Sequence, residues 1–288
     1  MTVLAFGANG QVGTALARLE GVTVLSRAEA DLSIPGKCAQ AIDEFKPVAV
    51  INAAAYTAVD QAESDEALAT AINGDAPGEM ARACAALGIP LVHISTDYVF
   101  AGDGDTPFNP SDPVAPLGAY GRSKEAGERA VREVGSAHVV LRTSWVFSET
   151  GTNFVKTMLK LGAERAALSI VDDQHGGPTP ARDIAATALR MVRALLDDPS
   201  LSGTYHYAGA PDCSWADFAT HIFDRAGLDV EVTRIPSSAY PTPAKRPLNS
   251  RMACATTTEA FGIERPDWRV GLDEVLLAME EGSHDKTP

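Results

Sequence analysis

The 288-residue sequence has a deficit of positive charge, few aromatic side chains and only four cysteines. Lysine and arginine number 24 against 38 aspartate and glutamate residues, so the net charge is −14 at pH 7. Because a phosphate backbone requires a basic binding face, this composition argues against nucleic-acid binding. An anionic small ligand stays possible, provided that its site is locally positive.

The scarce cysteines, Cys38, Cys84, Cys213 and Cys254, are scattered along the chain. They form no C-x-x-C pair and have no histidine at ligand spacing, which is typical of reduced structural thiols in a cytoplasmic protein. No apolar run is long enough to span a bilayer. The opening residues, MTVLAFGANG, also lack the basic segment of a signal peptide. We therefore expect a cytoplasmic protein that has no membrane partner.

Short apolar segments alternate with longer amphipathic ones over the first half of the chain. The apolar segments are rich in Val, Ile and Leu, as in strands that are covered on both faces. We expect strands at residues 2–6, 22–25, 48–54, 90–96 and 137–144. We expect helices at residues 11–19, 37–45, 65–87 and 117–134. This alternation predicts an α/β fold with a Rossmann-like, doubly wound parallel sheet.

The pattern loosens after about residue 147. We expect helices at 153–162, 181–196 and 214–227, a strand at 203–209, and an irregular proline-rich stretch at 236–251. These features predict a dinucleotide-binding domain over residues 1–147, with a returning segment at about 180–204. A smaller, mostly C-terminal substrate-binding domain is predicted over residues 148–288. The seam between the two is the expected ligand site.

The segment FGANGQVG joins the first expected strand to the first expected helix. Its glycines, Gly7, Gly10 and Gly13, are spaced G-x-x-G-x-x-G. Missing Cβ atoms at these positions permit a tight turn, close approach of a pyrophosphate and helix–strand packing. The alternative is a strand–turn–helix corner that binds nothing. Because a helix N-terminus favours phosphate, we interpret the segment as a dinucleotide-binding loop.

The end of the second expected strand bears on the choice of dinucleotide. An acidic residue there would bond a ribose 2′-hydroxyl, but the chain has Ser26 and Arg27. Arg27 is suited to a 2′-phosphate, although a solvated surface arginine is the alternative. Asp31 and Leu32 lie where an adenine-contacting loop would fall. NADPH is therefore favoured over NADH, which is not excluded.

Tyr120 and Lys124 lie four residues apart and so share one face of the expected helix. A lone Y-x-x-x-K pair occurs by chance in many helices. Upstream, however, Ser95 and Thr96 end the fourth expected strand, at the sheet edge where α/β proteins bind ligands. The glycine loop, the Ser-Thr strand end and the Tyr-x-x-x-Lys pair, in this order, are far more specific together.

These segments resemble the dTDP-4-dehydrorhamnose reductases, a family of the extended short-chain dehydrogenases/reductases. The similar segments run almost end to end and include GANGQVG, STDYVFAGDGDTPF, YGRSKEAGE, RTSWVFSETGTNF and RPLNSR. The resemblance implies NADPH-dependent reduction of the 4-keto group of dTDP-6-deoxy-L-lyxo-4-hexulose to dTDP-L-rhamnose. Tyr120 would donate the proton, and Lys124 together with the positive nicotinamide ring of the oxidised cofactor would lower the pKa of Tyr120. Lys124 would also bond the nicotinamide ribose, and Thr96 would bond the keto oxygen.

The resemblance also implies the remaining contacts. The cofactor contacts are expected to be Gly7, Asn9, Gly10, Gln11, Val12, Arg27, Asp31, Leu32, Ala53, Ala54, Ala55, Tyr56, Asn73, Tyr120 and Lys124. The substrate contacts are expected to be Thr96, Asp97, Tyr98, Trp145, Asn153, Lys245, Arg246 and Arg251. For Trp145 the alternative is core packing, and for the three basic residues near 250 it is a solvated loop.

No metal site is expected. Some members of the family dimerise through a magnesium ion held by glutamates, one of them on the first helix, where this chain has Ala15. Loss of that carboxylate removes a hard oxygen ligand. We therefore expect a monomer, or a dimer that is not bridged by magnesium. His175 is expected to be a loop or structural histidine, because no neighbour in the sequence completes a proton relay.

Other functions stay open at this level. One is a non-catalytic NADP-binding regulatory subunit like that of methionine adenosyltransferase, and another is a reductase of a different nucleotide 4-keto-6-deoxysugar. The joint presence of Tyr120, Lys124 and Thr96 weighs against the subunit. An epimerase or a dehydratase is a third possibility, but Asp97 is followed by Tyr98 rather than by a glutamate, which disfavours dehydration.

Overall fold

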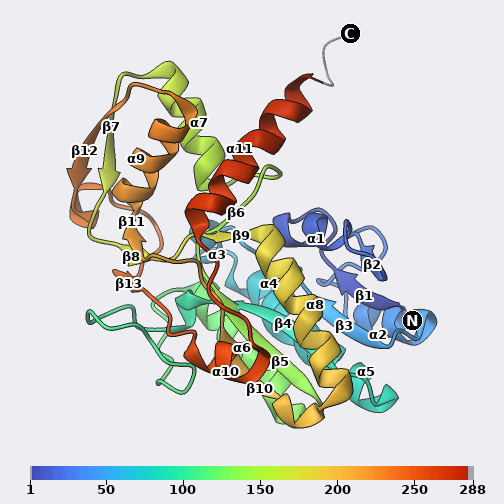
Figure 1. Ribbon diagram of the computed structural model, residues 1–288. Coiled ribbons are helices and arrows are strands. Elements are labelled where there is room, and N and C mark those ends of the chain that lie inside the picture. Colours follow the sequence, from blue (N-terminus) through green and yellow to red (C-terminus); the bar gives the residue numbers. More distant parts are fainter. Residues whose placement is uncertain (1, 285–288) are drawn as a thin grey trace.

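A six-stranded parallel sheet forms the centre of the computed structural model, which describes residues 2–284 (Figure 1). Its strands are β1 (Val3–Phe6), β2 (Val22–Leu25), β3 (Ala49–Asn52), β4 (Leu91–Thr96), β5 (His138–Thr143) and β10 (Gly203–His206). They are arranged in the order β10-β5-β4-β3-β1-β2, and every neighbouring pair is parallel. The winding reverses at β1, which lies between β2 and β3. The expected doubly wound α/β fold is confirmed.

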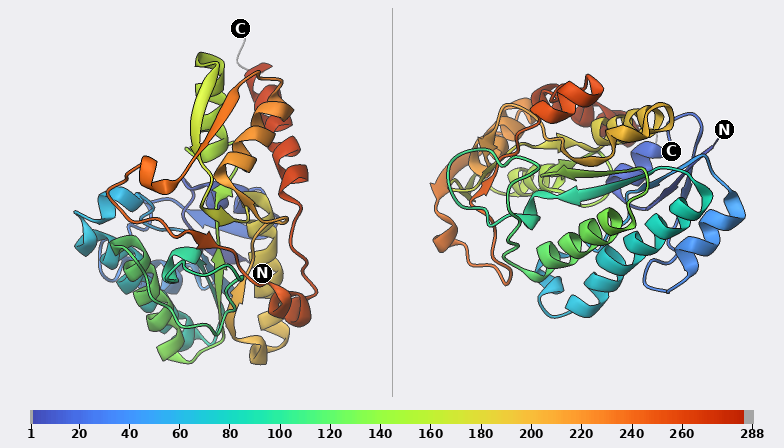
Figure 2. Two further views of the ribbon diagram at one scale, coloured as in Figure 1. Left: turned by 90° about the vertical axis from the view of Figure 1, so that its left-hand side faces the viewer. Right: turned by 90° about the horizontal axis from the view of Figure 1, so that it is seen from below.

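Helices cover both faces of this sheet (Figure 2). One face is covered by α1 (Gln11–Leu16), α8 (Ala181–Asp197) and α10 (Ala255–Phe261). The other face is covered by α2 (Lys37–Phe45), α5 (Ala76–Leu87) and α6 (Ala119–Val134). The strands are therefore apolar on both faces, which explains their nearly continuous apolar sequences.

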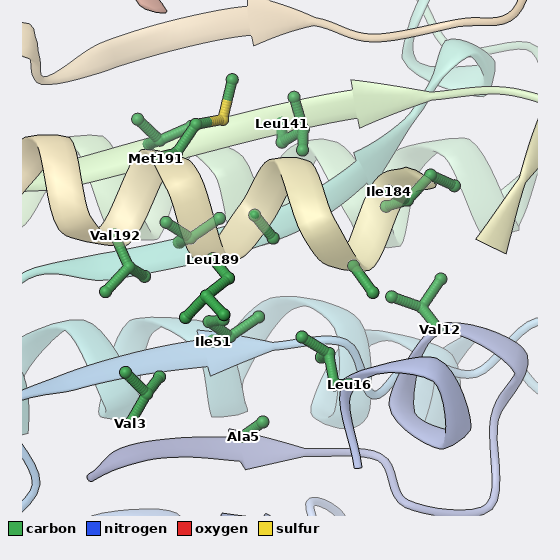
Figure 3. Close-up of a cluster of buried hydrophobic side chains, with 14 of the residues drawn as sticks. Val3, Ala5, Val12, Leu16, Ile51, Leu141, Ile184, Leu189, Met191 and Val192 are labelled. Atoms are coloured by element: carbon green, nitrogen blue, oxygen red, sulfur yellow. The ribbon is translucent and has the colours of Figure 1, made fainter. Parts of the chain in front are cut away.

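Alternate residues of each strand enter different cores. Ile51 of β3 and Leu141 of β5 face α8, whereas their neighbours Val50 and Val140 face the helices of the opposite layer. Figure 3 shows the first of these cores, in which Ile184 of α8 lies among strand and α1 side chains. Successive residues of a strand point to opposite faces, so a sheet with two covered faces needs apolar residues at both sets of positions.

The long helix expected at 65–87 has an irregular centre. It consists of α4 (Glu66–Thr70), a π-helical segment (Ala71–Asp75) and α5. Asn73, in the π-helical segment, accepts a hydrogen bond from the Tyr56 N–H at 2.8 Å and donates to the Tyr56 carbonyl at 3.0 Å. The segment thus holds the loop that follows β3, which also contains the short helix α3 (Val59–Ala62).

A second lobe lies beside one edge of the sheet, in the upper part of Figure 1. Its helices are α7 (Phe154–Glu164), α9 (Trp215–Ala226) and α11 (Trp268–His284). Its strands are β6 (Val146–Phe147), β7 (Ala167–Val171), β8 (His175–Gly176), β9 (Thr179–Pro180), β11 (Cys213–Ser214), β12 (Glu231–Ile235) and β13 (Asn249–Ser250). A separate cluster of buried side chains, including Phe218 and Leu272, forms its core.

Several of these short strands were not expected from the sequence. The parallel pair β7–β12 joins segments about sixty residues apart, and His175 lies in β8 between β11 and β13 rather than in a loop. The helix at 214–227 was expected, and its N-cap is Ser214, which forms a capping box with Asp217.

The segment expected to return to the first domain, about residues 180–204, contains α8 and the beginning of β10. A second segment also returns to the first domain at a place not located from the sequence, where α10 packs against α8 and β10. The domain boundaries themselves stay a prediction.

All four cysteines are buried and free. Burial raises the pKa of Cys38, Cys84 and Cys213 to about 12, so these thiols are poor nucleophiles at neutral pH. Within residues 2–284, none of the helices has both the length and the apolar character needed to cross a membrane.

The core around α8 gives a test of the fold. We predict that Ile184→Ala, which truncates a fully buried side chain, lowers the free energy of unfolding by about 2–5 kcal/mol through the lost contacts and the cavity that it leaves. Chemical denaturation measures this change. Leu196→Ala is the matched control, because Leu196 is on the same helix with 44% of its surface exposed. Equal losses in both variants would contradict the packing described here.

Candidate active site

A cavity of about 720 Å³ lies beyond the carboxyl ends of the central strands. Its walls include Gly7 after β1, Ala53 after β3, Thr96 at the end of β4 and Thr143 at the end of β5. The carboxyl ends of parallel strands at a reversal of winding are where doubly wound proteins bind ligands. The fold therefore creates this cavity at the place where a ligand is expected.

The glycine loop forms a corner that has no room for side chains. Gly7 has φ +108°, and a Cβ there would lie 2.9 Å from backbone atoms of Ala53 and Ala54. A Cβ on Gly13 would lie 1.8 Å from the Gly7 carbonyl oxygen. Gly10 is the N-cap of α1, and its N–H donates to the same carbonyl at 2.9 Å. The corner therefore brings bare backbone to the cavity wall, as close approach of a pyrophosphate requires.

Arg27 lines the cavity near the end of β2, with 70% of its side chain exposed. Its Nε donates to a carboxylate oxygen of Asp31 at 3.0 Å. Hydrogen bonds from Ser33, with a smaller contribution from Arg27, lower the pKa of Asp31, so that carboxylate stays ionised and holds the guanidinium. The Ser26 hydroxyl donates to Glu29 at 2.7 Å. Arg27 therefore places a positive charge on the cavity wall near the end of β2.

Thr96, Tyr120 and Lys124 all line the same cavity. Tyr120 lies in the first turn of α6, and Lys124 follows one turn later on the same face. Lys124 is only 2% exposed, and its Nζ donates to the Ile94 carbonyl at 2.7 Å. The Tyr98 and Tyr120 rings meet edge to face with centroids 5.5 Å apart. The structure thus brings the three expected catalytic side chains together, whereas their roles stay predictions.

Burial shifts the acidity of both helix residues. It raises the pKa of Tyr120 to about 12, although the Thr96 hydroxyl acts in the opposite direction. It lowers the pKa of Lys124 to about 8, although Glu128 acts in the opposite direction. Desolvation disfavours the charged form of each group. The described residues alone therefore keep the phenol protonated. The lowered tyrosine pKa is expected from Lys124 together with the positive nicotinamide ring of the oxidised cofactor, and it stays a prediction.

Asp97 is a buried carboxyl group on the cavity wall, with 3% of its surface exposed. Its Oδ1 accepts a hydrogen bond from the Thr96 hydroxyl at 2.9 Å, and its Oδ2 is buried with no hydrogen-bond partner within residues 2–284. Burial raises its pKa to about 6, with Ser250 and Thr96 acting in the opposite direction. An unpaired buried oxygen at a cavity wall is a suitable acceptor for a ligand hydroxyl.

Comparison with known proteins fits this geometry. The family model described as the RmlD substrate binding domain matches residues 1–281. A dTDP-4-dehydrorhamnose reductase from Burkholderia thailandensis is 47% identical over 290 residues, covering 94% of this chain and 97% of that protein. The chain belongs to the dTDP-4-dehydrorhamnose reductase family.

Solved structures of this reductase family share the fold. The dTDP-4-dehydrorhamnose reductase of Clostridium acetobutylicum has a TM-score of 0.90 and 36% identity, over 97% of this chain and 100% of that chain. The enzyme of Bacillus anthracis, crystallised in complex with NADP, has a TM-score of 0.89 and 36% identity, over 96% and 100% of the two chains. The resemblance drawn from the sequence segments is therefore confirmed.

Five contacts that the reductase resemblance implies lie off the cavity wall, whereas all the others line it. Asn73 is 1% exposed, and its amide is engaged with the Tyr56 backbone and the Ser123 hydroxyl. Asn153 is the N-cap of α7 and donates to the Gln11 side chain at 2.9 Å. Both asparagines therefore hold cavity-lining segments in place instead of lining the cavity themselves.

The three basic residues near 250 are also outside the wall. Lys245 is exposed, Arg251 donates to the Asn249 side chain at 2.9 Å, and Arg246 forms an ion pair with Asp60 at 2.7 Å. The partners of the two arginines explain their positions. Nη1 of Arg246 is nevertheless buried and has no partner in the described part of the chain.

Several cavity residues from later strands and loops were not expected from the sequence. Thr143 and Ser144 line the cavity at the end of β5, and Gly151 and Thr152 line it just before α7. Ligands bind beyond the carboxyl ends of parallel strands, and this rule applies to β5 as well as to β4. Thr143 and Ser144 were therefore predictable. The sequence of the loop before α7 contains no comparable indication of a ligand site.

Glu128, also missed, organises a buried polar cluster beneath Lys124. It accepts two bonds from Arg142, at 2.6 and 2.9 Å, one from the Ser95 hydroxyl at 2.6 Å and one from Arg132 at 3.0 Å. Although burial acts to raise it, these hydrogen bonds bring the pKa of Glu128 below its usual value. An arginine within the apolar segment AHVVLRTS was the available signal for such a partner.

Residues 2–284 contain no cluster of three or more His, Cys, Asp or Glu side chains that could hold a metal ion. Ala15, where some family members have a glutamate, is buried in the core between α1 and α8. The expected monomer, or dimer not bridged by magnesium, stays a prediction.

Asp97 gives a pH-dependent prediction. Its pKa is raised from 3.8 to about 6, so between these values the folded state binds more protons than the unfolded state. Stability contributed by this group is therefore present at low pH and is lost as the pH rises through this window. We expect the free energy of unfolding of the parent to fall relative to that of Asp97→Asn over this range.

Denaturation of both proteins at a series of pH values measures the difference. Glu29→Gln is a control with the opposite expected sign, because hydrogen bonds from Ser26 lower the pKa of Glu29. As the pH rises, the free energy of unfolding of the parent should increase relative to that of Glu29→Gln. A difference between parent and Asp97→Asn that stays flat across the window would contradict the effect of burial on this carboxyl group.

Proposed function

We propose that this chain catalyses NADPH-dependent reduction of the 4-keto group of dTDP-6-deoxy-L-lyxo-4-hexulose, which yields dTDP-L-rhamnose. The observation that carries the proposal is that Thr96, Tyr120 and Lys124 share one cavity with the glycine corner. The names of its family members support the substrate, and the NADP complex of the Bacillus anthracis enzyme supports the cofactor. NADH stays a possible alternative reductant.

The residues present fit a dinucleotide. Gly7 and Gly13 form a corner that any Cβ would fill. The N–H groups in the first turn of a helix such as α1 have no intrahelical partner and would face a pyrophosphate. Arg27 would bond the 2′-phosphate, because its terminal nitrogens are left over after Nε binds Asp31. Ala53 supplies a small side chain where the phosphate–ribose portion would pass. A bound reduced nicotinamide would supply the hydride for the keto carbon.

Tyr120 donates the proton to the oxygen of the reduced carbon. A pKa of about 12 keeps the phenol protonated at neutral pH, which is the form that a proton donor needs. Lys124, held by the Ile94 carbonyl, has two further N–H groups for the nicotinamide ribose and adds positive charge near the developing alkoxide. Thr96 orients the keto oxygen beside the phenol.

The sugar and diphosphate require further contacts. Asp97, Tyr98 and Trp145 line the cavity and would meet the deoxyhexose. Among the basic residues near 250, Arg246 is the strongest candidate for the diphosphate. Its Nη1 is buried without a partner among residues 2–284, and its charge acts on Tyr98, which lies on the cavity wall.

The main test replaces the proton donor. Tyr120→Phe should reduce turnover by about a hundred- to ten-thousandfold, the usual contribution of a positioned general acid, and should leave NADPH binding intact. NADPH consumption with a panel of nucleotide 4-keto sugars measures turnover, and titration of the cofactor measures binding. Tyr205→Phe is the matched control, because the Tyr205 hydroxyl bonds the Leu201 carbonyl away from the cavity.

Full turnover in Tyr120→Phe would disprove the acid assignment. If the parent binds NADPH but oxidises it with no member of the panel, the chain is instead a non-catalytic subunit. The preferred sugar in the panel separates rhamnose synthesis from reduction of another nucleotide 4-keto-6-deoxysugar.

A second test concerns the choice of cofactor. Arg27→Ala should weaken NADPH binding by about ten- to a hundredfold, the usual worth of a hydrogen bond to a charged group, because the 2′-phosphate loses its partner. NADH binding should be unchanged. Dissociation constants for both cofactors check this. Equal weakening of NADPH and NADH binding would show that Arg27 stabilises the loop rather than recognising the 2′-phosphate.

A further inference from the structure

Trp145 has an unusual backbone conformation. It lies between β5 and β6 with φ +48°, in the left-handed region that bulky side chains rarely adopt. Such a conformation costs about 1–3 kcal/mol and persists only where the surroundings enforce it, often at ligand sites. The neighbouring contacts of Trp145 must therefore hold it in place.

The principal contact is a stacked indole. Trp215, the first residue of α9, lies parallel to Trp145, with ring centroids 3.5 Å apart and an interplanar angle of 10°. Trp215 is held in turn, because its Nε1 donates to the Gln174 side chain at 3.1 Å and Phe154 packs against its ring at 4.5 Å. One face of Trp145 is thus occupied by a ring that is itself immobilised.

A glycine confines Trp145 further. A Cβ on Gly176 of β8 would lie 2.8 Å from Cε2 and 3.1 Å from Cζ2 of Trp145. The absence of a side chain at this position therefore makes room for the indole. Trp145 lines the cavity, but Trp215 does not. Trp145 is therefore the ring through which Trp215 reaches the cavity wall.

We infer that Trp215 is a positioning residue for the sugar of the substrate. By stacking on Trp145, it sets the part of the indole that the cavity presents to the deoxyhexose. This inference rests on the proposed function. According to this inference, α9 of the second lobe determines the shape of the sugar end of the cavity, whereas the proposed proton donor is on α6. The occupied face of Trp145 also means that the sugar meets only the other face or the edge of the ring.

The alternative is that the two indoles merely extend the core of the second lobe, since both pack against its buried cluster. The two explanations differ in kinetics. A positioning role changes the KM for the nucleotide sugar and leaves kcat and cofactor binding unchanged, because Trp215 touches none of the groups that transfer hydride or proton. A purely structural role changes stability and leaves KM unchanged.

The experiment begins with Trp215→Ala in the full chain. Stacked indoles give an exciton couplet in far-ultraviolet circular dichroism, and the variant should lose it. The KM for the nucleotide 4-keto sugar should rise about two- to tenfold, the range expected when an aromatic pair is lost, with the NADPH dissociation constant unchanged. Trp215→Phe keeps an aromatic ring against Trp145 and should restore much of the KM.

Trp268→Phe is the matched control. Trp268 packs on Phe218 of α9 with centroids 5.1 Å apart and belongs to the same core, but it has no ring contact with Trp145. This variant should lose stability and keep both the couplet and the parental KM. An equal rise in KM here would show that general packing of the lobe, and not the stacked pair, governs the sugar site.

Two other results would overturn the inference. Loss of the couplet in Trp215→Ala with an unchanged KM would show that the stack does not act on the substrate. An equal rise in KM in Trp215→Phe and Trp215→Ala would show that an aromatic ring at position 215 does not position Trp145. An inactive parent that retains the couplet marks a different failure, because it would refute the proposed function, and with it the role toward the sugar, while the stacked pair stands.

Discussion

The geometry of the site depends on buried charges that tie α6 to the strands beneath it. Lys124 donates to the Ile94 carbonyl of β4, and Glu128, one turn later, binds Ser95 of β4 and Arg142 of β5. Removing one member of a buried ion pair costs about 3–5 kcal/mol, because its partner is left uncompensated. These contacts therefore determine where the first turn of α6 places its phenol relative to the end of β4.

The sequence was most informative where local chemistry and fold agree. The apolar runs identified the first five strands to within a few residues, and the glycine spacing identified a corner that excludes Cβ atoms. It was least informative where a partner is distant. Arg246 is paired with Asp60, 186 residues away, and nothing near either residue predicts the pair. The strands β7 and β12 are short and join distant segments, so they carry little periodic signal.

The two lobes divide the work of the proposed reaction. The sheet lobe contributes the glycine corner, the strand ends and α6, all of which follow from one parallel topology and could be predicted together. The second lobe shapes the cavity through Trp145, whose backbone strain and stacking on Trp215 are tertiary properties. A tryptophan after a strand is ordinary in a sequence. The contacts that constrain Trp145 come from α9 and β8, so they are known only from the three-dimensional structure.

The protonation of the side chains near the end of β4 supports Tyr120 as the proposed proton donor. The Thr96 hydroxyl has a single proton, and it donates that proton to Asp97 in the structure. With a pKa raised to about 6, Asp97 is mostly ionised at neutral pH and competes with a keto oxygen for the hydrogen bond from Thr96. Tyr120 holds its own proton up to a pKa of about 12 on the same cavity wall. This difference supports Tyr120 as the proposed proton donor, while Thr96 is proposed to orient the keto oxygen.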